Sequence, residues 1–316
     1  MSVIATASLT FLMLPLMCQS SESAKWCYNS QSKDCGASKW KDIEPTCGGM
    51  KQSPINIVRT KAQRNNSLEA FQFIGYDTAP SGKWTIVNNG HALQVNLQGE
   101  ISISGGGLPA RYNALQFHFH WGRESGNGSE HTIDGKQYPM ELHIVHLNSK
   151  YDAVHDAKNH ETGLAVLGFM YKIDDKNNTN YSTITSALRN VSYKADQVEL
   201  ASTFRLDSLL PPLETLSRYY RYYGSLTTPD CAEAVIWTVF EEPISISKKQ
   251  YASFVNSIFF SSATERPVNM QENFRPVQEL NKRQVFASKD ATESSCSAPT
   301  VSLLLTILSV LAVRLV

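Results

Sequence analysis

Residues 116–121 read QFHFHW, and no other stretch of this 316-residue chain says as much about its fold and chemistry. On a β-strand alternate side chains share a face, so His118 and His120 point the same way while Phe117 and Phe119 point into the opposite layer. Two imidazoles side by side among aromatic residues are hard to explain as packing. The stretch therefore predicts a strand that carries a pair of metal ligands.

A second strand is indicated at residues 140–146, MELHIVH, after a loop over 122–138. If it neighbours the first strand and His143 faces His118 and His120, three neutral imidazoles meet. Zinc is then the natural occupant. It accepts nitrogen ligands, is tetrahedral, and keeps its fourth position open for water in catalytic sites.

The same parity indicates how the rings are held. Glu141 lies two residues before His143, and Gln116 lies two residues before His118, so each can accept the ring N–H that does not bind metal. Three further histidines are expected to be packed or solvated rather than ligands: His146, His155 and His160.

The rest of the body is typical of β-structure, because short apolar or alternating runs recur between glycine and asparagine turn signals. Strands are expected at 84–87, 93–97, 101–103, 115–121, 140–147, 164–171 and 234–240. The best helical windows are 179–190 and 248–258, the latter capped by Ser247. No linker interrupts the body. We expect one mainly β domain over residues 21–285, with short peripheral helices.

Composition excludes two classes of protein. Lys plus Arg and Asp plus Glu are 29 each, so the formal net charge is zero, which argues against a nucleic-acid partner held by a basic face. With 42% hydrophobic and 18% charged residues the chain is not disordered.

Residues 1–20 are interpreted as a secretory signal peptide, because small residues follow the apolar run 9–17. A buried first helix is the alternative, which Pro15 disfavours. At the other end, residues 301–316 are mostly apolar. As a helix they would span about 24 Å, short of the roughly 30 Å hydrocarbon core.

The small residues before this run favour a glycosylphosphatidylinositol (GPI) anchor. We expect attachment at Ser294 or Ser295, with 286–295 as a linker and 296–316 removed. A short tilted transmembrane helix is the alternative. The expected location is the extracellular face of the plasma membrane, reached through the secretory pathway.

Four cysteines remain when Cys18 and Cys296, in the two terminal signals, are set aside, and an even number suits an oxidising compartment. Three pairings are open, and our hypothesis is Cys27–Cys35 with Cys47–Cys231. A four-cysteine zinc site is disfavoured because the chain has no C-x2-C. Candidate N-glycosylation sites are Asn65, Asn127, Asn177, Asn180 and Asn190.

The segments QSPINI, NNGHALQV, QFHFHWG, GSEHTID, ELHIVHLN, GLAVLGF, YGSLTTP and ENFRPVQ follow one another between residues 26 and 283. Together they resemble an α-class carbonic anhydrase, in particular the membrane-anchored type IV group. The resemblance implies a large twisted, mainly antiparallel central sheet with surface helices and a conical cavity. It also implies reversible hydration of carbon dioxide to bicarbonate and a proton, with Zn²⁺ on His118, His120 and His143.

The resemblance further implies that zinc-bound hydroxide attacks carbon dioxide. Thr227 would accept a hydrogen bond from this hydroxide and donate one to Glu130, which orients the nucleophile, and Thr228 would contact bicarbonate. The implied apolar pocket for carbon dioxide consists of Val145, Val166, Leu226, Val235 and Trp237. Sulfonamides and anions are expected inhibitors, and a bicarbonate transporter is an expected partner.

The proton released at the metal needs a relay group that titrates near pH 6.5. His91 matches the shuttle position of the family, and Tyr28 and Asn89 match residues that order the water chain. Two positions depart from common family patterns, Gln94 and Asp230, and both are expected to affect rate or inhibitor preference rather than metal binding.

Two alternatives belong to other classes. An inactive carbonic-anhydrase-like binding or adhesion ectodomain would usually lack one zinc histidine, whereas this chain keeps all three. A zinc peptidase would need H-E-x-x-H, which the sequence does not contain. The zinc enzyme is therefore the favoured interpretation.

Overall fold

The computed structural model describes residues 26–292. The predicted signal peptide, Ser294, Ser295 and the predicted anchor signal lie outside these residues. Within 26–292, no helix has both the length and the apolar character needed to cross a bilayer.

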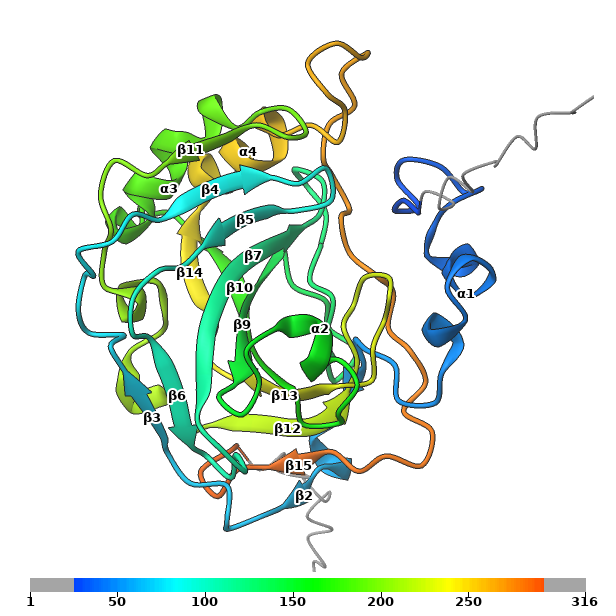
Figure 1. Cartoon of the computed structure of the whole chain (residues 1–316), viewed down its shortest axis with the longest axis vertical. Helices are drawn as coiled ribbons and strands as arrows, with labels where there is room; N and C mark the ends of the chain where they lie inside the picture. The colour runs from blue at the N-terminus through cyan, green and yellow to red at the C-terminus, as the bar shows by residue number, and fades with distance from the viewer. Residues whose placement is uncertain (1–25, 293–316) are drawn as a thin grey trace, which may run out of the picture.

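One large sheet passes through the described part of the chain (Figure 1). Its main path runs β11-β4-β5-β7-β9-β10-β13-β12-β15-β2, while β3, β6 and β14 pair at its sides. The strands are β2 (Gln63–Arg64), β3 (Phe71–Ile74), β4 (Thr85–Asn88), β5 (Leu93–Asn96), β6 (Ser102–Gly105), β7 (Tyr112–Trp121), β9 (Met140–Asn148), β10 (Leu164–Asp174), β11 (Gln197–Glu199), β12 (Tyr219–Gly224), β13 (Val235–Phe240), β14 (Ile244–Ser247) and β15 (Phe286–Ala287). A separate parallel pair consists of β1 (Asn56–Ile57) and β8 (Thr132–Ile133).

Most neighbouring strands are antiparallel, so the predicted mainly β, mostly antiparallel fold is confirmed. The exceptions in the large sheet are β10 with β13, β10 with β14, and β15 with β2, which are parallel. Each of the seven predicted strands corresponds to one of β4, β5, β6, β7, β9, β10 and β13, with ends that coincide or differ by at most three residues.

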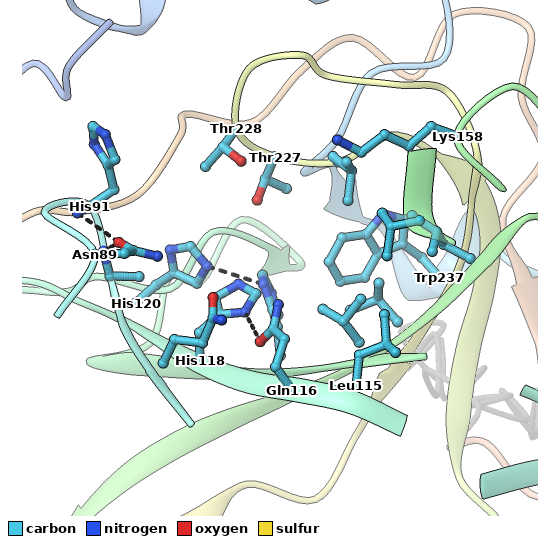
Figure 2. A pocket seen from close by; sticks show the side chains of 18 of the residues that line it. Asn89, His91, Leu115, Gln116, His118, His120, Lys158, Thr227, Thr228 and Trp237 are labelled. Carbon is cyan, nitrogen blue, oxygen red and sulfur yellow. Dashed lines mark hydrogen bonds between the residues drawn. The ribbon is translucent and has the colours of Figure 1, made fainter. Parts of the chain in front are cut away.

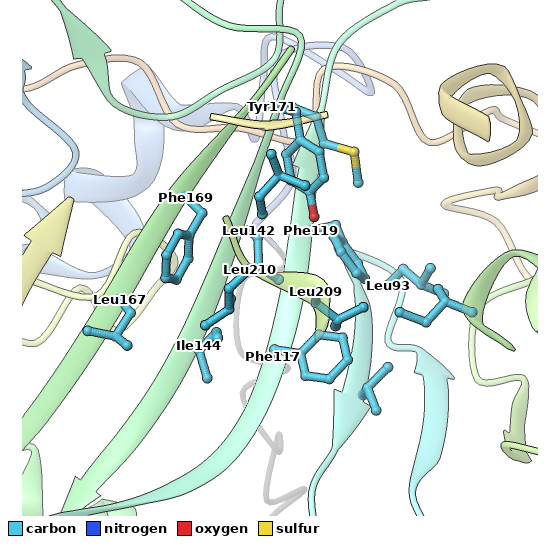
Figure 3. Packing of buried hydrophobic residues seen from close by; sticks show 14 of the residues in the cluster. Leu93, Phe117, Phe119, Leu142, Ile144, Leu167, Phe169, Tyr171, Leu209 and Leu210 are labelled. Atoms are coloured by element: carbon cyan, nitrogen blue, oxygen red, sulfur yellow. The ribbon is translucent and has the colours of Figure 1, made fainter. Parts of the chain in front are cut away.

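The two faces of the sheet bury two different hydrophobic clusters. Phe117 and Phe119 of β7 pack on one face with Leu142 and Ile144 of β9 (Figure 3). The opposite face carries Val145, Val166 and Trp237. Burying each large apolar side chain contributes roughly 1.5–3 kcal/mol, so this alternation fixes which face each histidine must take.

Short helices lie around the sheet, as the sequence indicates (Figure 1). They are α1 (Trp40–Ile43), α2 (Val154–Ala157), α3 (Ser182–Ala187) and α4 (Lys248–Ser257). Helical turns cover the whole predicted window 179–190, of which α3 is the centre. Ser247 caps α4 as predicted, and its side chain and that of Gln250 form a reciprocal capping box.

Two disulfides connect the N-terminal segment to itself and to the body. Cys27 is joined to Cys35 and Cys47 is joined to Cys231, which is the pairing expected from the sequence. The five sequon asparagines all reach the surface, with Asn65 half-buried and the others exposed.

Candidate metal centre

Strands β7 and β9 bring three histidines together. His118 and His143 are directly opposed in the antiparallel register of these strands, and His120 is the next residue on the same face of β7. The ring centroids are 5.0 Å apart for His118 and His120, 5.2 Å for His118 and His143, and 4.6 Å for His120 and His143. Figure 2 shows the His118 and His120 rings turned toward each other at the base of the cavity.

Two of the rings are held by the partners that parity predicts. His118 Nδ1–H donates to Gln116 Oε1 at 2.9 Å, and His143 Nε2–H donates to Glu141 Oε1 at 2.7 Å. These bonds leave the lone pairs on Nε2 of His118 and Nδ1 of His143 free for a metal.

The third ring has a partner that sequence reasoning missed. His120 Nδ1–H donates to the backbone carbonyl of Asn273 at 2.8 Å. The Asn273 side chain is itself fixed, because it accepts from the Trp121 N–H at 2.8 Å and donates to the carbonyl of Phe119 at 3.1 Å. Asn273 lies in a segment without regular secondary structure, so no sequence periodicity could have predicted its contact with His120.

The donor set fits a zinc ion. His118, His120 and His143 each offer one ligand atom, and these atoms lie within 4.8 Å of one another. Burial lowers the pKa of His118 and of His120, so both are neutral at pH 7, which is the form that binds metal. No fourth side chain joins this group among the described residues, which leaves one tetrahedral position open.

Glu141 links the metal ligands to a buried network. Its Oε1 also accepts from His131 Nδ1–H at 2.7 Å, and its Oε2 accepts from the N–H groups of Glu130 and His131, both at 2.8 Å. Burial by itself would raise the pKa of Glu141, but His131 and His143 outweigh it and hold that pKa well below its usual range. His131 is therefore a supporting residue. It lies in the segment GSEHTID, but no role for it was predicted from the sequence.

Glu130 is fully enclosed beside the ligands. Its Oε1 accepts from the backbone N–H of Arg275 at 2.7 Å, and its Oε2 lies 3.4 Å from Nε2 of His120. That Oε2 accepts no hydrogen bond from any residue between 26 and 292. The hydrogen bond expected from Thr227 is therefore not formed here, and a buried carboxylate oxygen is left facing the metal site.

The three histidines lie in a cavity of about 290 Å³ with one apolar wall and one polar wall. Val145, Val166, Leu226 and Trp237 line it as predicted, together with Thr227 and Thr228. Val235 is not among the lining residues. Its side chain is fully buried in the cluster of this sheet face, and its register partner Leu164 lines the cavity instead.

The predicted proton-relay residues lie on the polar wall. Tyr28, Asn89 and His91 all line the cavity, and the Asn89 side chain accepts from the His91 N–H at 2.9 Å. The His91 ring points away from the three histidines (Figure 2) and stacks on Trp26, with the two ring centroids 3.7 Å apart. Burial, and secondarily the charge of Lys194, lowers the pKa of His91 to about 4.

Known proteins resemble this chain over most of its length. Residues 35–289 match the model of the eukaryotic-type carbonic anhydrase family. The chain is 44% identical to carbonic anhydrase 15 of Mus musculus over 292 residues, which cover 91% of this chain and 90% of the relative. It is 41% identical to carbonic anhydrase 4 of Rattus norvegicus over 309 residues, or 96% and 97% of the two chains. Identity to carbonic anhydrase 12 of Homo sapiens is 37% over 283 residues, or 89% and 77%.

Proposed function

The chain belongs to the eukaryotic-type carbonic anhydrase family, and from this membership we propose how its own residues carry out the reaction. It is a zinc-dependent lyase that hydrates carbon dioxide reversibly. The observation that carries the proposal is the set of three converging imidazoles, each with its outer nitrogen tied to an acceptor.

His118, His120 and His143 would hold the zinc ion. When bound, zinc lowers the pKa of a coordinated water to about 7, for which carbonic anhydrases are the reference case. The three outer hydrogen bonds keep the rings from rotating, so the site is built before the metal arrives. Because imidazole binds a metal in its neutral form, the ion would keep its full positive charge to act on water.

Thr227 and Glu130 would orient the attacking oxygen. Glu130 Oε2 is buried without a hydrogen bond from the described residues, and an ionised carboxylate can only accept one. We infer that the Thr227 hydroxyl supplies that bond during the reaction and presents its own oxygen as an acceptor. Thr228, next along the cavity wall, would contact bicarbonate.

Carbon dioxide would bind against Val145, Val166, Leu226 and Trp237, because a neutral molecule gains most from apolar surface. The proton would leave by His91, with Tyr28 and Asn89 ordering the water between. The Tyr28 hydroxyl is buried without a partner among residues 26–292, so it is available to such water. His91 can act near pH 7 only after it leaves Trp26, because its pKa is about 4 in the stacked position.

Metal analysis with stopped-flow hydration of carbon dioxide tests the reaction. We expect one zinc per chain in the wild type, and loss of both zinc and activity in His143→Ala. His160→Ala is the matched control, because His160 is exposed and its ring stacks on Tyr151, outside the cavity lining. A folded wild-type protein that holds zinc but hydrates no carbon dioxide would favour the binding-ectodomain alternative.

We further propose that the enzyme works at the outer face of the plasma membrane on a GPI anchor at Ser294 or Ser295. The terminal apolar runs and the two disulfides support this location. Treatment of intact cells with a phosphatidylinositol-specific phospholipase should release the protein. Retention on the membrane would favour the transmembrane helix instead.

Sugar at the sequons belongs to the same proposal. The exposed asparagines Asn127, Asn177, Asn180 and Asn190 are accessible, and Asn65 is half-buried. A fall in apparent mass after treatment with an N-glycosidase would support it, and an unchanged mass would remove it.

A further inference from the structure

Lys158 adds a charge to a cavity wall that is otherwise apolar. It is the only lysine, arginine, aspartate or glutamate among the described residues that line the cavity of the three histidines. Val154, Leu164 and Leu226 belong to the same lining. Carbon dioxide is neutral and gains nothing from a cation here, so the proposed function leaves Lys158 unexplained.

The backbone that carries Lys158 is firmly placed. Lys158 follows α2, and its N–H donates to the carbonyl of Val154 at 3.0 Å. Gly163 approaches this turn so closely that a Cβ atom there would stand 1.9 Å from the carbonyl oxygen of Ala157. The side chain extends from this fixed point toward the loop that carries Thr227 and Thr228 (Figure 2).

Asp230 holds the ammonium group, with Nζ of Lys158 and Oδ2 of Asp230 3.0 Å apart. The two side chains are 30% and 43% exposed, and pairs this exposed are weak. The other Asp230 oxygen, Oδ1, accepts no hydrogen bond from residues 26–292. Lysine has a flexible stem, so an anion in the cavity can compete with Asp230 for the ammonium.

We propose that Lys158 is a specificity-determining residue that attracts carboxylate-bearing ligands to this wall, and that Asp230 competes with them. The inference rests on the proposed function, because the metal anchors such ligands in the cavity. Bicarbonate is the anion of this class that the reaction itself supplies. Asp230 is fixed for its part, since the next residue, Cys231, is bonded to Cys47 and donates its N–H to the carbonyl of Thr228 at 2.8 Å.

The test compares two matched ligands of the zinc-loaded enzyme. Both are benzenesulfonamides; one carries a para-carboxylate and the other a para-carboxamide, attached directly or through one or two methylene groups. At low ionic strength, Lys158→Gln should weaken the carboxylate ligand about two- to fivefold relative to the carboxamide, the range measured for exposed ion pairs. Asp230→Asn should strengthen the carboxylate ligand by a similar factor.

The double variant separates the two roles. If Asp230 acts only through its ion pair with Lys158, then Asp230→Asn should not change the affinity for the carboxylate ligand in the Lys158→Gln background. Lys150→Gln is the matched control, because it removes the same charge from an exposed residue outside the cavity lining. An equal effect of Lys150→Gln would overturn the proposal. The preference for the carboxylate ligand would then come from the net charge of the protein and not from Lys158.

An unchanged ratio of the two affinities in Lys158→Gln, at all three spacer lengths, would also overturn it. The carboxamide ligand distinguishes this failure from that of the proposed function. Unaltered binding of the carboxamide ligand to Lys158→Gln would show that the metal site of the variant is intact. No binding of the carboxamide to the wild type would remove the proposed function, and this inference with it.

Discussion

At the scale of single residues, His91 is in the position of a proton relay but in the wrong environment for one. Its ring lies flat against Trp26, with an angle of 16° between the planes. Its Nδ1 is buried and has no hydrogen-bond partner among residues 26–292. A proton on Nδ1 would therefore lack both water and an acceptor, and burial is the main cause of the low pKa of His91.

Removing Trp26 should restore an ordinary histidine. We expect Trp26→Ala to raise the pKa of His91 from about 4 toward 6.5, because water then reaches the ring. Lys194→Gln should raise it less, because the charge of Lys194 is the smaller cause. Titration of the His91 ring by NMR measures both changes. If the pKa stays near 4 in Trp26→Ala, stacking on Trp26 does not account for the shift.

The convergence of the candidate zinc ligands could be predicted from the sequence because strand parity is strict. His118, His120, Gln116 and Glu141 all follow from the rule that alternate residues share a face. Asn273 could not be found in this way, because it reaches His120 through its backbone carbonyl from an irregular segment. The rotamer of His91 could not be predicted from the sequence either, because it depends on the contact with Trp26.

At the scale of elements, β9 shows how a buried strand accommodates a histidine outside the group of three. His146 is opposite Ala114 of β7 and Ala165 of β10, and these small residues leave room for its ring. The Tyr76 hydroxyl donates to His146 Nε2 at 2.6 Å, and His146 Nδ1–H donates to the carbonyl of Ala165 at 3.2 Å. Burial lowers the pKa of His146 to about 4.

This histidine should make the fold sensitive to acid. Between pH 6.5 and 4 the unfolded chain binds a proton at His146 and the folded chain does not, so stability falls as the pH falls. From pH 7 to 4.5 the loss is about 2 kcal/mol. His146→Gln cannot titrate, and we expect the wild type to lose about that much more stability than the variant over this interval. Urea unfolding at both pH values measures the difference, and parallel losses would contradict the prediction.

Helices and strands could be predicted where the sequence has a clear hydrophobic pattern or capping motif. Ser247 with Gln250 marks the start of α4, and a continuous apolar run marks the first eight residues of β10, apart from one glycine. The parallel pairing of β10 with β13 was not predictable, because it joins segments about 70 residues apart and no local signal fixes their direction. In that register Val235 lies beside Leu164, so the extent to which each reaches the cavity could not be predicted either.

At the scale of the whole molecule, the cavity depends on segments that lie far apart in the described chain. Tyr28 and Trp26 come from the N-terminal segment, whereas Thr227 and Thr228 come from the loop before β13. This N-terminal segment, with α1, runs along the side of the body (Figure 1). The Cys47–Cys231 disulfide fastens it to the same loop, four residues after Thr227.

The two disulfides should differ in what they contribute to stability. Cys47 and Cys231 are 184 residues apart, whereas Cys27 and Cys35 are 8 apart. In the chain-entropy model the long loop stabilises the folded state by about 5 kcal/mol and the short loop by about 2.5 kcal/mol, because closing a longer loop restricts the unfolded chain more. We expect the double variant Cys47→Ser/Cys231→Ser to lose roughly twice the unfolding free energy lost by Cys27→Ser/Cys35→Ser. Denaturant unfolding of both variants measures this, and an equal or reversed order would show that native-state contacts around Cys47, rather than loop closure, decide the stability.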